Sequence, residues 1–255
     1  MSSYAEGNQI PQFVRLPFII YKWIFIAPFL AFTTVLLTIP IIILSFLGAG
    51  NFSSRVIAKA WARINAAAAM IKVEILGRDK LDPNRSYIIV VNHQSLTDIY
   101  ALYGFLECDV KWVMKKELRA IPVFGHAAVA MGHIIIDRSN TKSAVQTIND
   151  ARAKIHGGMS VIFFPEGTRS DPGELRKFKK GAFRFAIELG LPILPVALHG
   201  AANILPSNTI DLMPGKIKLE YCDPIPTAGM DISDVTRLAI QARESIHQAL
   251  HKTED

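Results

Sequence analysis

The sequence predicts an α/β fold, with a central mixed or mainly parallel sheet of about seven strands flanked by helices and an N-terminal membrane-associated helical segment. Two observations lead to this prediction. Beyond residue 72, short runs rich in β-branched and aromatic residues alternate with amphipathic stretches, which is typical of strands connected by helices. Before it lies a stretch of 28 residues, 23–50, without a charged side chain.

The uncharged stretch predicts a retained membrane anchor. Its 28 residues reach roughly 42 Å as a helix, which exceeds a hydrocarbon core of about 30 Å. The stretch is too long for the apolar part of a signal peptide and has no convincing cleavage site. Because Pro28 and Pro40 each remove a backbone donor and kink a helix, a single tilted span and a shallow re-entrant hairpin are both open. A buried core helix is a third alternative.

Basic residues are more frequent after this stretch than before it, which places the C-terminal part of the chain at the cytoplasmic face of the inner (plasma) membrane. A helix over residues 53–71 carries Arg55, Lys59 and Arg63 on one face and apolar side chains on another. We expect this helix to lie on the bilayer surface beside acidic headgroups. Residues 1–72 are therefore expected to form a membrane anchor and an amphipathic helix.

Residues 73–255 are expected to form an α/β domain. Apolar runs such as SYIIVV fit strands that are covered on both faces. The predicted strands are residues 73–76, 87–91, 110–114, 134–137, 161–164, 193–198 and 217–221. The predicted helices include residues 96–105, 141–155, 181–189 and 232–251. Ligands of such sheets bind beyond the carboxyl ends of the strands, so residues that follow strands are the candidates for a site.

Composition limits the class of protein. Of 255 residues, 50% are hydrophobic and 20% are charged, which excludes a disordered chain, and the mean hydropathy of +0.26 indicates contact with lipid. The net charge of +6 favours anionic partners such as phosphate groups or acidic lipids. Cys108 and Cys222 are far apart and belong to no metal-binding Cys/His spacing, so we predict neither a disulfide framework nor a zinc site. We expect the protein to lie in a reducing, cytosolic environment. No serine-hydrolase elbow, Walker A loop, H-E-x-x-H or dinucleotide fingerprint occurs in the sequence.

The first candidate group follows the second predicted strand. His93 and Asp98 are five residues apart, which would place them about 140° apart on one helix. Both can therefore serve one site only if His93 precedes the helix and Asp98 lies in its first turn. The residues from Ser95 to Asp98 read S-x-x-D, which predicts a helix start with Ser95 as the N-cap. The structural alternative is a capping carboxylate beside a loop histidine.

The second group follows the fifth predicted strand and reads Pro-Glu-Gly-Thr-Arg. Gly167 permits close approach of the backbone to a ligand, and the guanidinium of Arg169 suits bidentate recognition of phosphate. An ordinary turn with a solvated arginine is the alternative. Taken alone, residues 132–138 and 191–196 are weak indications of a functional site.

We interpret the basic and aromatic stretch 176–185 as a lipid-facing rim or a solvated helix start and not as a nucleic-acid site.

Four blocks of the sequence occur in order after the apolar segment. They are Asn92-His93-x4-Asp98, Gly132 to Arg138, Phe164-Pro165-Glu166-Gly167-Thr168-Arg169 and Leu194-Pro195-Val196. Together they resemble the glycerolipid acyltransferase family, and more narrowly its 1-acyl-sn-glycerol-3-phosphate acyltransferases of the bacterial type. The resemblance covers about residues 92–196, and its first and third blocks together are specific.

The resemblance implies transfer of an acyl group from acyl-CoA or acyl carrier protein to the sn-2 hydroxyl of lysophosphatidic acid, forming phosphatidic acid. It implies that His93 is the base and that Asp98 orients it. The residues implied to bind the phosphorylated acceptor are Lys115, Arg138, Glu166, Gly167 and Arg169.

The chemistry of these residue types agrees with acyl transfer. An alcohol is hardly ionised at pH 7, so a histidine, whose ordinary pKa is about 6.5, must take the proton as the new C–O bond forms. A carboxylate on the second ring nitrogen fixes the tautomer and stabilises the imidazolium. A thioester is already activated, so we expect no metal, cofactor or covalent nucleophile.

Three other functions remain open from the sequence. The nearest is the same reaction on another lysolipid, such as a lyso-ornithine lipid or a lysophospholipid. A membrane thioesterase, in which His93 activates water, and a non-catalytic lipid-binding membrane protein are the others. The expected partners are lysophosphatidic acid, the acyl donor and membrane lipids. The sequence leaves acyl-chain length, the choice between the two donors and the oligomeric state undetermined.

Overall fold

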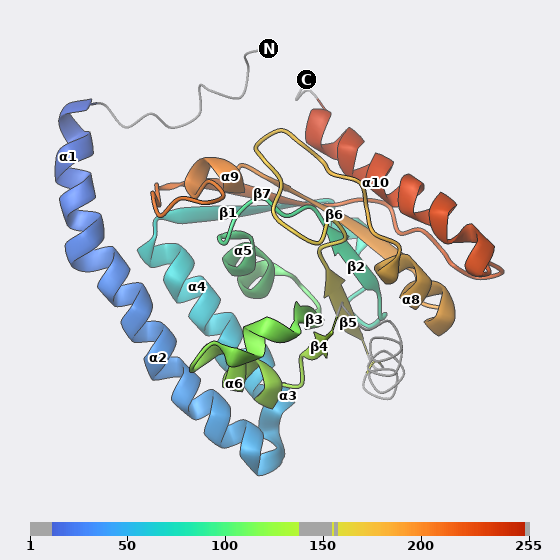
Figure 1. Cartoon of the computed structure of the whole chain (residues 1–255), viewed down its shortest axis with the longest axis horizontal. Helices are drawn as coiled ribbons and strands as arrows, with labels where there is room; N and C mark the ends of the chain where they lie inside the picture. Colours follow the sequence, from blue (N-terminus) through green and yellow to red (C-terminus); the bar gives the residue numbers. More distant parts are fainter. Residues whose placement is uncertain (1–11, 138–154, 156–157, 253–255) are drawn as a thin grey trace.

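Seven strands form one sheet in the order β1-β7-β6-β2-β5-β3-β4 (Figure 1). The computed structural model describes residues 12–137, 155 and 158–252. Neighbouring strands are parallel except for β6 and β7, which run antiparallel. The predicted mixed, mainly parallel sheet is thus confirmed.

The strands lie where the apolar β-branched runs predict them, with each end within two residues of the prediction. They are β1 (Ile71–Leu76), β2 (Ile88–Val91), β3 (Asp109–Lys115), β4 (Ile134–Ile136), β5 (Met159–Phe163), β6 (Ile193–His199) and β7 (Gly215–Tyr221).

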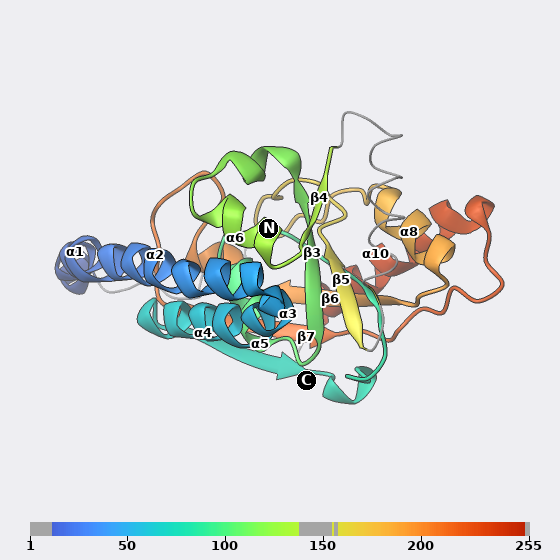
Figure 2. The same ribbon diagram turned by 90° about the horizontal axis from the view of Figure 1, so that it is seen from below.

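Helices cover both faces of the sheet (Figures 1 and 2). Beyond the N-terminal segment the α-helices are α5 (Asp98–Phe105), α6 (Phe124–Ala130), α8 (Gly181–Leu189), α9 (Ala201–Ile204) and α10 (Val235–His251). Short 3-10 helices are η4 (Arg78–Lys80), η5 (Lys116–Ala120) and η6 (Ile232–Asp234). Most of the predicted helix 141–155 lies outside the described residues.

The alternation of side chains along β2 divides the core into two clusters. Ile89 and Val91 pack into the cluster that includes α5, whereas Ile88 and Val90 pack into the cluster that includes α8 and α10. All four side chains are fully buried. The strand that leads to His93 is therefore rigidly held from both sides.

The N-terminal segment folds as a helical hairpin. Its first arm contains α1 (Gln12–Tyr21), η1 (Lys22–Ile26) and α2 (Ala27–Leu44), and it runs through Pro40 without ending there. The chain reverses at Gly48, whose φ of 85° lies in the left-handed region. Among the described residues, the one helical stretch long and apolar enough to cross a membrane is Leu16–Ala68, which includes both arms of the hairpin.

The second arm returns beside the first (Figures 1 and 2). After the turn η2 (Ser45–Ala49) and the short α3 (Gly50–Phe52), it consists of η3 (Ser53–Ala58) and α4 (Lys59–Ala68). Both arms expose apolar side chains. The large apolar side chains exposed along α2 are Phe29, Phe32, Val35, Leu36, Ile39 and Ile43.

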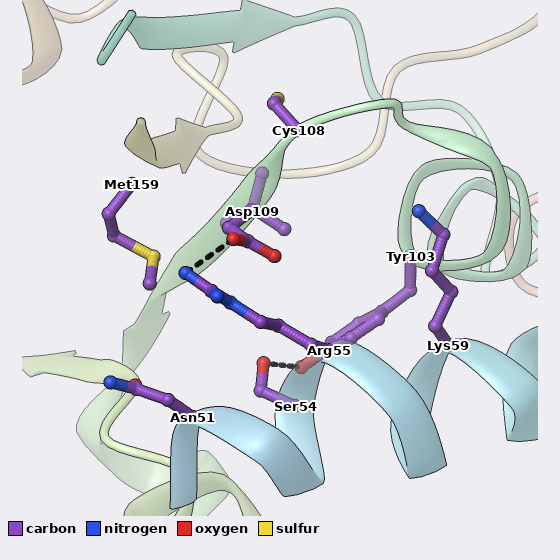
Figure 3. A pocket seen from close by; sticks show the side chains of 9 residues that line it. Asn51, Ser54, Arg55, Lys59, Tyr103, Cys108, Asp109 and Met159 are labelled. Atoms are coloured by element: carbon purple, nitrogen blue, oxygen red, sulfur yellow. Dashed lines mark hydrogen bonds and ion pairs between the residues drawn. The ribbon is translucent and has the colours of Figure 1, made fainter. Parts of the chain in front are cut away.

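The basic residues of this helix contact the protein, although Arg55 and Arg63 are themselves exposed. Arg55 pairs with Asp109 at 2.6 Å (Figure 3), and Lys59 and Arg63 donate to carbonyls at the C-terminal end of α5, at 2.8 and 2.7 Å. The last carbonyls of a helix lack intrahelical partners and attract cations, which explains these contacts. Ile64 is exposed as well.

Candidate active site

Two loops meet at the carboxyl edge of the sheet. β2 and β5 are parallel neighbours with Val90 opposite Phe163, so the residues that follow the two strands lie side by side. Asn92 ties this edge to β6, because its side chain donates to the carbonyl of Leu198 at 2.9 Å and accepts from the N–H of Leu198 at 2.8 Å. The edge is the place where open α/β sheets bind ligands.

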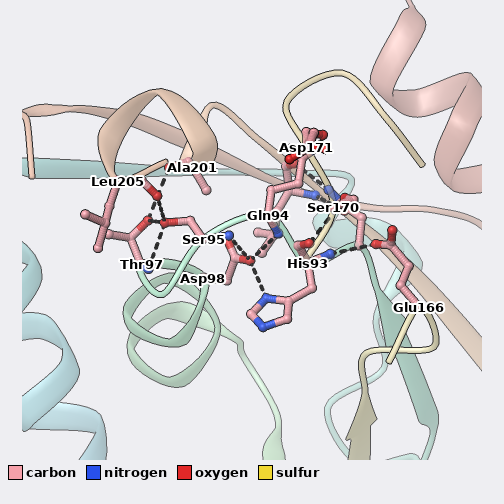
Figure 4. A network of polar contacts seen from close by, with 12 residues as sticks. His93, Gln94, Ser95, Thr97, Asp98, Glu166, Ser170, Asp171, Ala201 and Leu205 are labelled. Atoms are coloured by element: carbon pink, nitrogen blue, oxygen red, sulfur yellow. Dashed lines mark hydrogen bonds and ion pairs between the residues drawn. The ribbon is translucent and has the colours of Figure 1, made fainter. Parts of the chain in front are cut away.

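His93 and Asp98 form a hydrogen-bonded pair in the first of these loops (Figure 4). Nδ1 of His93 lies 2.7 Å from Oδ2 of Asp98, the first residue of α5. The same oxygen accepts the backbone N–H groups of Gln94 and Ser95, at 2.9 and 3.0 Å, and the carboxylate is buried. A carboxylate on Nδ1 makes Nε2 the ring nitrogen through which a proton can be exchanged with a ligand.

The predicted helix start is met only in part. Ser95 donates its N–H to Asp98, as in a capping box, but its hydroxyl accepts from the N–H of Thr97 at 3.1 Å. That hydroxyl also donates to the carbonyl of Leu205 at 2.8 Å. The helix begins at Asp98 with Thr97 as its N-cap, so the prediction of Ser95 as the N-cap is wrong. The reason is that Ser95 bridges to the segment after α9 instead of capping α5.

Glu166 joins the second loop to the first. One carboxylate oxygen accepts the backbone N–H of His93 at 2.9 Å, and the other accepts the N–H of Arg176 at 3.0 Å. Burial raises the pKa of the Glu166 carboxyl, and these two hydrogen bonds oppose that shift in part. In this arrangement the carboxylate is turned toward backbone donors of the protein.

The turn after β5 presents Gly167 and Arg169. Gly167 donates its N–H to the carbonyl of Phe164 at 3.0 Å and adopts a φ of 78°, which favours glycine. Arg169 is half-buried, and no ion pair of its guanidinium is found within the described part of the chain.

Of the two other predicted acceptor-binding residues, the structure describes Lys115. It is the exposed last residue of β3, which is parallel to its neighbour β5, so it lies at the same carboxyl edge of the sheet. Its neighbour Lys116 is engaged with Asp137 at 2.8 Å. Arg138 lies outside the described residues.

Phe164 is a site residue that sequence reasoning missed. Its ring lies face to face with the imidazole of His93, with the ring centroids 3.9 Å apart. The parallel register of β2 and β5 brings the two loops to the same face, and no sequence signal gives this register. Among the described residues, no three His, Cys, Asp or Glu side chains are grouped as a metal site would require.

Comparisons with known proteins identify the family. The model of the acyltransferase family matches residues 72–199, which contain both loops. A 1-acyl-sn-glycerol-3-phosphate acyltransferase of Chlamydomonas reinhardtii is 30% identical over 232 residues, 90% of this chain and 68% of that protein. A chloroplastic relative of the same description from Brassica napus is 34% identical over 197 residues, 76% of this chain and 55% of that protein.

A solved structure shares the fold. The crystal structure of the 1-acyl-sn-glycerophosphate (LPA) acyltransferase from Thermotoga maritima matches with a TM-score of 0.64 and 23% identity, over 89% of this chain and 100% of that chain. The family match spans the two loops that carry the His-Asp pair and the Glu-Gly-Thr-Arg turn. By sequence over most of its length, this chain belongs to the acyltransferase family.

Proposed function

We propose that this chain transfers an acyl group from acyl-CoA or acyl carrier protein to the sn-2 hydroxyl of 1-acyl-sn-glycerol-3-phosphate, forming phosphatidic acid. The observation that carries the proposal is the 2.7 Å hydrogen bond between Nδ1 of His93 and Oδ2 of Asp98, beside the turn that presents Arg169. The relatives support the choice of acceptor, because those reported above are described as acyltransferases of this lysolipid.

The proposed reaction needs one base and one positioned alcohol. Nε2 of His93 takes the proton of the sn-2 hydroxyl while its oxygen attacks the thioester carbon, and Asp98 stabilises the imidazolium that forms. The tetrahedral intermediate then collapses, the C–S bond breaks, and the thiolate leaves with the proton from Nε2. Because the thioester is already activated, we propose no metal or cofactor for this chemistry.

The phosphate of the acceptor would be held at the same edge of the sheet. We assign Arg169 to this role because its guanidinium lies in the turn after β5 and suits bidentate phosphate binding. Lys115, Arg138 and Gly167 are further proposed contacts, whereas Glu166 supports the loop through its backbone hydrogen bonds. Holding the phosphate fixes the distance between the hydroxyl and the base.

The apolar hairpin supports membrane attachment. Its exposed face would enter the lipid, and the catalytic unit, residues 73–255, would then lie at the cytoplasmic face of the inner membrane. Lysophosphatidic acid carries an acyl chain that enters lipid, so an enzyme held at the membrane surface meets its acceptor there.

Acyl transfer by purified full-length protein tests the proposal. Wild type, His93→Ala, Asp98→Asn and the control His126→Ala, an exposed residue of α6, are incubated with lysophosphatidic acid and labelled oleoyl-CoA or oleoyl carrier protein. We expect kcat to fall by about 10²–10⁴-fold in the first two variants and to stay near the wild-type value in the control. Asparagine keeps the shape but cannot accept the Nδ1 proton through its amide nitrogen.

The outcomes distinguish the alternatives. Wild-type rates in His93→Ala would remove this histidine from catalysis. Release of free fatty acid that does not depend on the acceptor would show a thioesterase. Equal rates with a lyso-ornithine lipid would show that the phosphomonoester does not select the acceptor.

A further inference from the structure

The basic segment after the Glu-Gly-Thr-Arg turn, residues 176–180, is held firmly against that turn. Arg243 of α10 donates to the carbonyls of Leu175 and Arg176, at 2.7 and 3.2 Å. The N–H of Arg176 donates to Glu166, and the N–H of Lys179 donates to the carbonyl of Pro165 at 2.8 Å. The segment is thus fixed at both ends, and the position of Lys179 follows from these contacts.

The side chain of Lys179 lies directly over Gly167. A Cβ built on Gly167 would lie 2.6 Å from Nζ and 2.8 Å from Cε of this lysine, so an alanine at this position would displace the ammonium. The space beside the glycine is therefore occupied by a cation. The left-handed φ of 78° is the conformational reason for a glycine at residue 167.

The ammonium of Lys179 has no acidic partner among the residues that the structure describes. The nearest acid along the turn, Glu166, is buried and accepts the backbone N–H of His93 (Figure 4). It also accepts the N–H of Arg176. Arg169 in the turn and Lys179, whose ammonium lies over Gly167, therefore bring to this turn two positive charges that have no ion pair within the described part of the chain. The turn is linked to the catalytic loop through Glu166.

We propose that Lys179 binds the phosphate of the acceptor as a further cation beside Arg169, and that Gly167 leaves the room it needs. A phosphate monoester carries close to two negative charges at pH 7, which one guanidinium compensates only in part. An ammonium on a flexible stem supplies a compact point charge that complements the planar guanidinium. This inference rests on the proposed function and names a further binding residue for it.

Steady-state kinetics with the full chain test the proposal. Lys179→Met keeps the apolar stem and removes the charge, Lys179→Arg restores a charge, and Lys177→Met is the matched control in the same segment, where the lysine is exposed. We expect KM for lysophosphatidic acid to rise about 10- to 100-fold in Lys179→Met, with KM for acyl-CoA within twofold of wild type. Lys179→Arg should recover part of the loss, and Lys177→Met should match wild type.

A second measurement is independent of turnover. The thermal midpoint of wild type and Lys179→Met is compared with and without glycerol 3-phosphate, and with glycerol as the uncharged control probe. Stabilisation by glycerol 3-phosphate should be present in wild type and lost in Lys179→Met.

Each outcome decides between the two proposals. An unchanged KM for lysophosphatidic acid in Lys179→Met, or a rise in KM for acyl-CoA alone, would overturn the role of Lys179 while leaving the acyltransferase activity in place. A wild-type protein that binds glycerol 3-phosphate through Lys179 but acylates no lysophosphatidic acid would refute the proposed function and retain the phosphate site. Absence of both binding and a Lys179 effect would overturn the inference.

Discussion

The imidazole of His93 stacks on the phenyl ring of Phe164, with the ring centroids 3.9 Å apart and the planes inclined by 14°. Phe164 in turn contacts the buried Trp112, at a centroid distance of 5.8 Å. His93 is therefore held at three places. Asp98 binds Nδ1 of the ring, Glu166 accepts the backbone N–H, and Phe164 covers one face of the ring. An aromatic face also attracts the imidazolium that forms when the ring takes a proton.

Replacing Phe164 by leucine should slow catalysis without weakening substrate binding. The leucine keeps apolar bulk but removes the flat surface, and a ring pair contributes about 0.5–1.5 kcal/mol, so we expect kcat to fall about 3- to 10-fold. KM for both substrates should stay within about twofold. The measurement is acyl transfer by the purified variant at saturating donor and acceptor.

Phe163→Leu is the matched control. Phe163 is the preceding residue on the opposite face of β5, where its ring meets Phe185 of α8 at 5.7 Å. This variant loses a comparable ring pair without touching His93. A similar fall of kcat in both variants would show that the effect of Phe164→Leu is a general loss of packing.

The sequence predicts those parts of the site whose residues are close together along the chain. His93 and Asp98 are five residues apart, and a strand followed by a helix leaves few ways to place them. The strands were predictable for a similar reason, since apolar β-branched runs are bounded by turn residues. Phe164 and Lys179 could not be assigned, because their positions depend on the register of β2 and β5 and on the return of a loop held by Arg243.

The N-terminal segment shows a second limit of sequence reasoning. The sequence indicates that the segment is helical. It does not indicate that the chain reverses at Gly48 instead of at a proline. Periodicity separates basic from apolar side chains without saying which of them meets the protein. Arg63 is exposed but donates to the carbonyl of Gly104, because α5 ends beside it, which is a fact of tertiary structure.

Glu166→Gln should destabilise the protein by loosening the two loops. The carboxylate accepts two backbone N–H groups, whereas a glutamine offers one oxygen and turns its NH₂ group toward the other donor. A buried donor left without a partner costs about 1–3 kcal/mol, so we expect the thermal midpoint to fall by roughly 2–10 °C. Thermal unfolding in one detergent at pH 7.5 measures this change.

Glu174→Gln provides the comparison for Glu166→Gln, because Glu174 lies in the same segment with an exposed side chain. Its midpoint should stay within about 1 °C of wild type. An unchanged midpoint in Glu166→Gln would mean that the loops are held by other contacts.

His133 makes the stability of the fold depend on pH. It is buried at the start of β4, where its ring meets the hydroxyl of Tyr103 at 3.2 Å and the N–H of Trp112 at 3.4 Å. Burial, with a smaller effect of the nearby Lys111 ammonium, lowers the pKa of His133 to about 3. In the unfolded chain a histidine has a pKa of about 6.5.

Between these two pKa values the unfolded chain binds one more proton at His133 than the folded protein does, so stability falls as the pH drops below about 6.5. The slope contributed by this residue approaches about 1.4 kcal/mol per pH unit. We expect His133→Gln, which keeps polar atoms but does not titrate, to lose less stability between pH 7.5 and pH 5 than wild type. The control His126→Gln, on the surface of α6, should retain the wild-type dependence. Chemical unfolding at the two pH values measures the free energy of unfolding of each variant. An equal loss of this free energy in His133→Gln and wild type would assign the acid sensitivity to other groups.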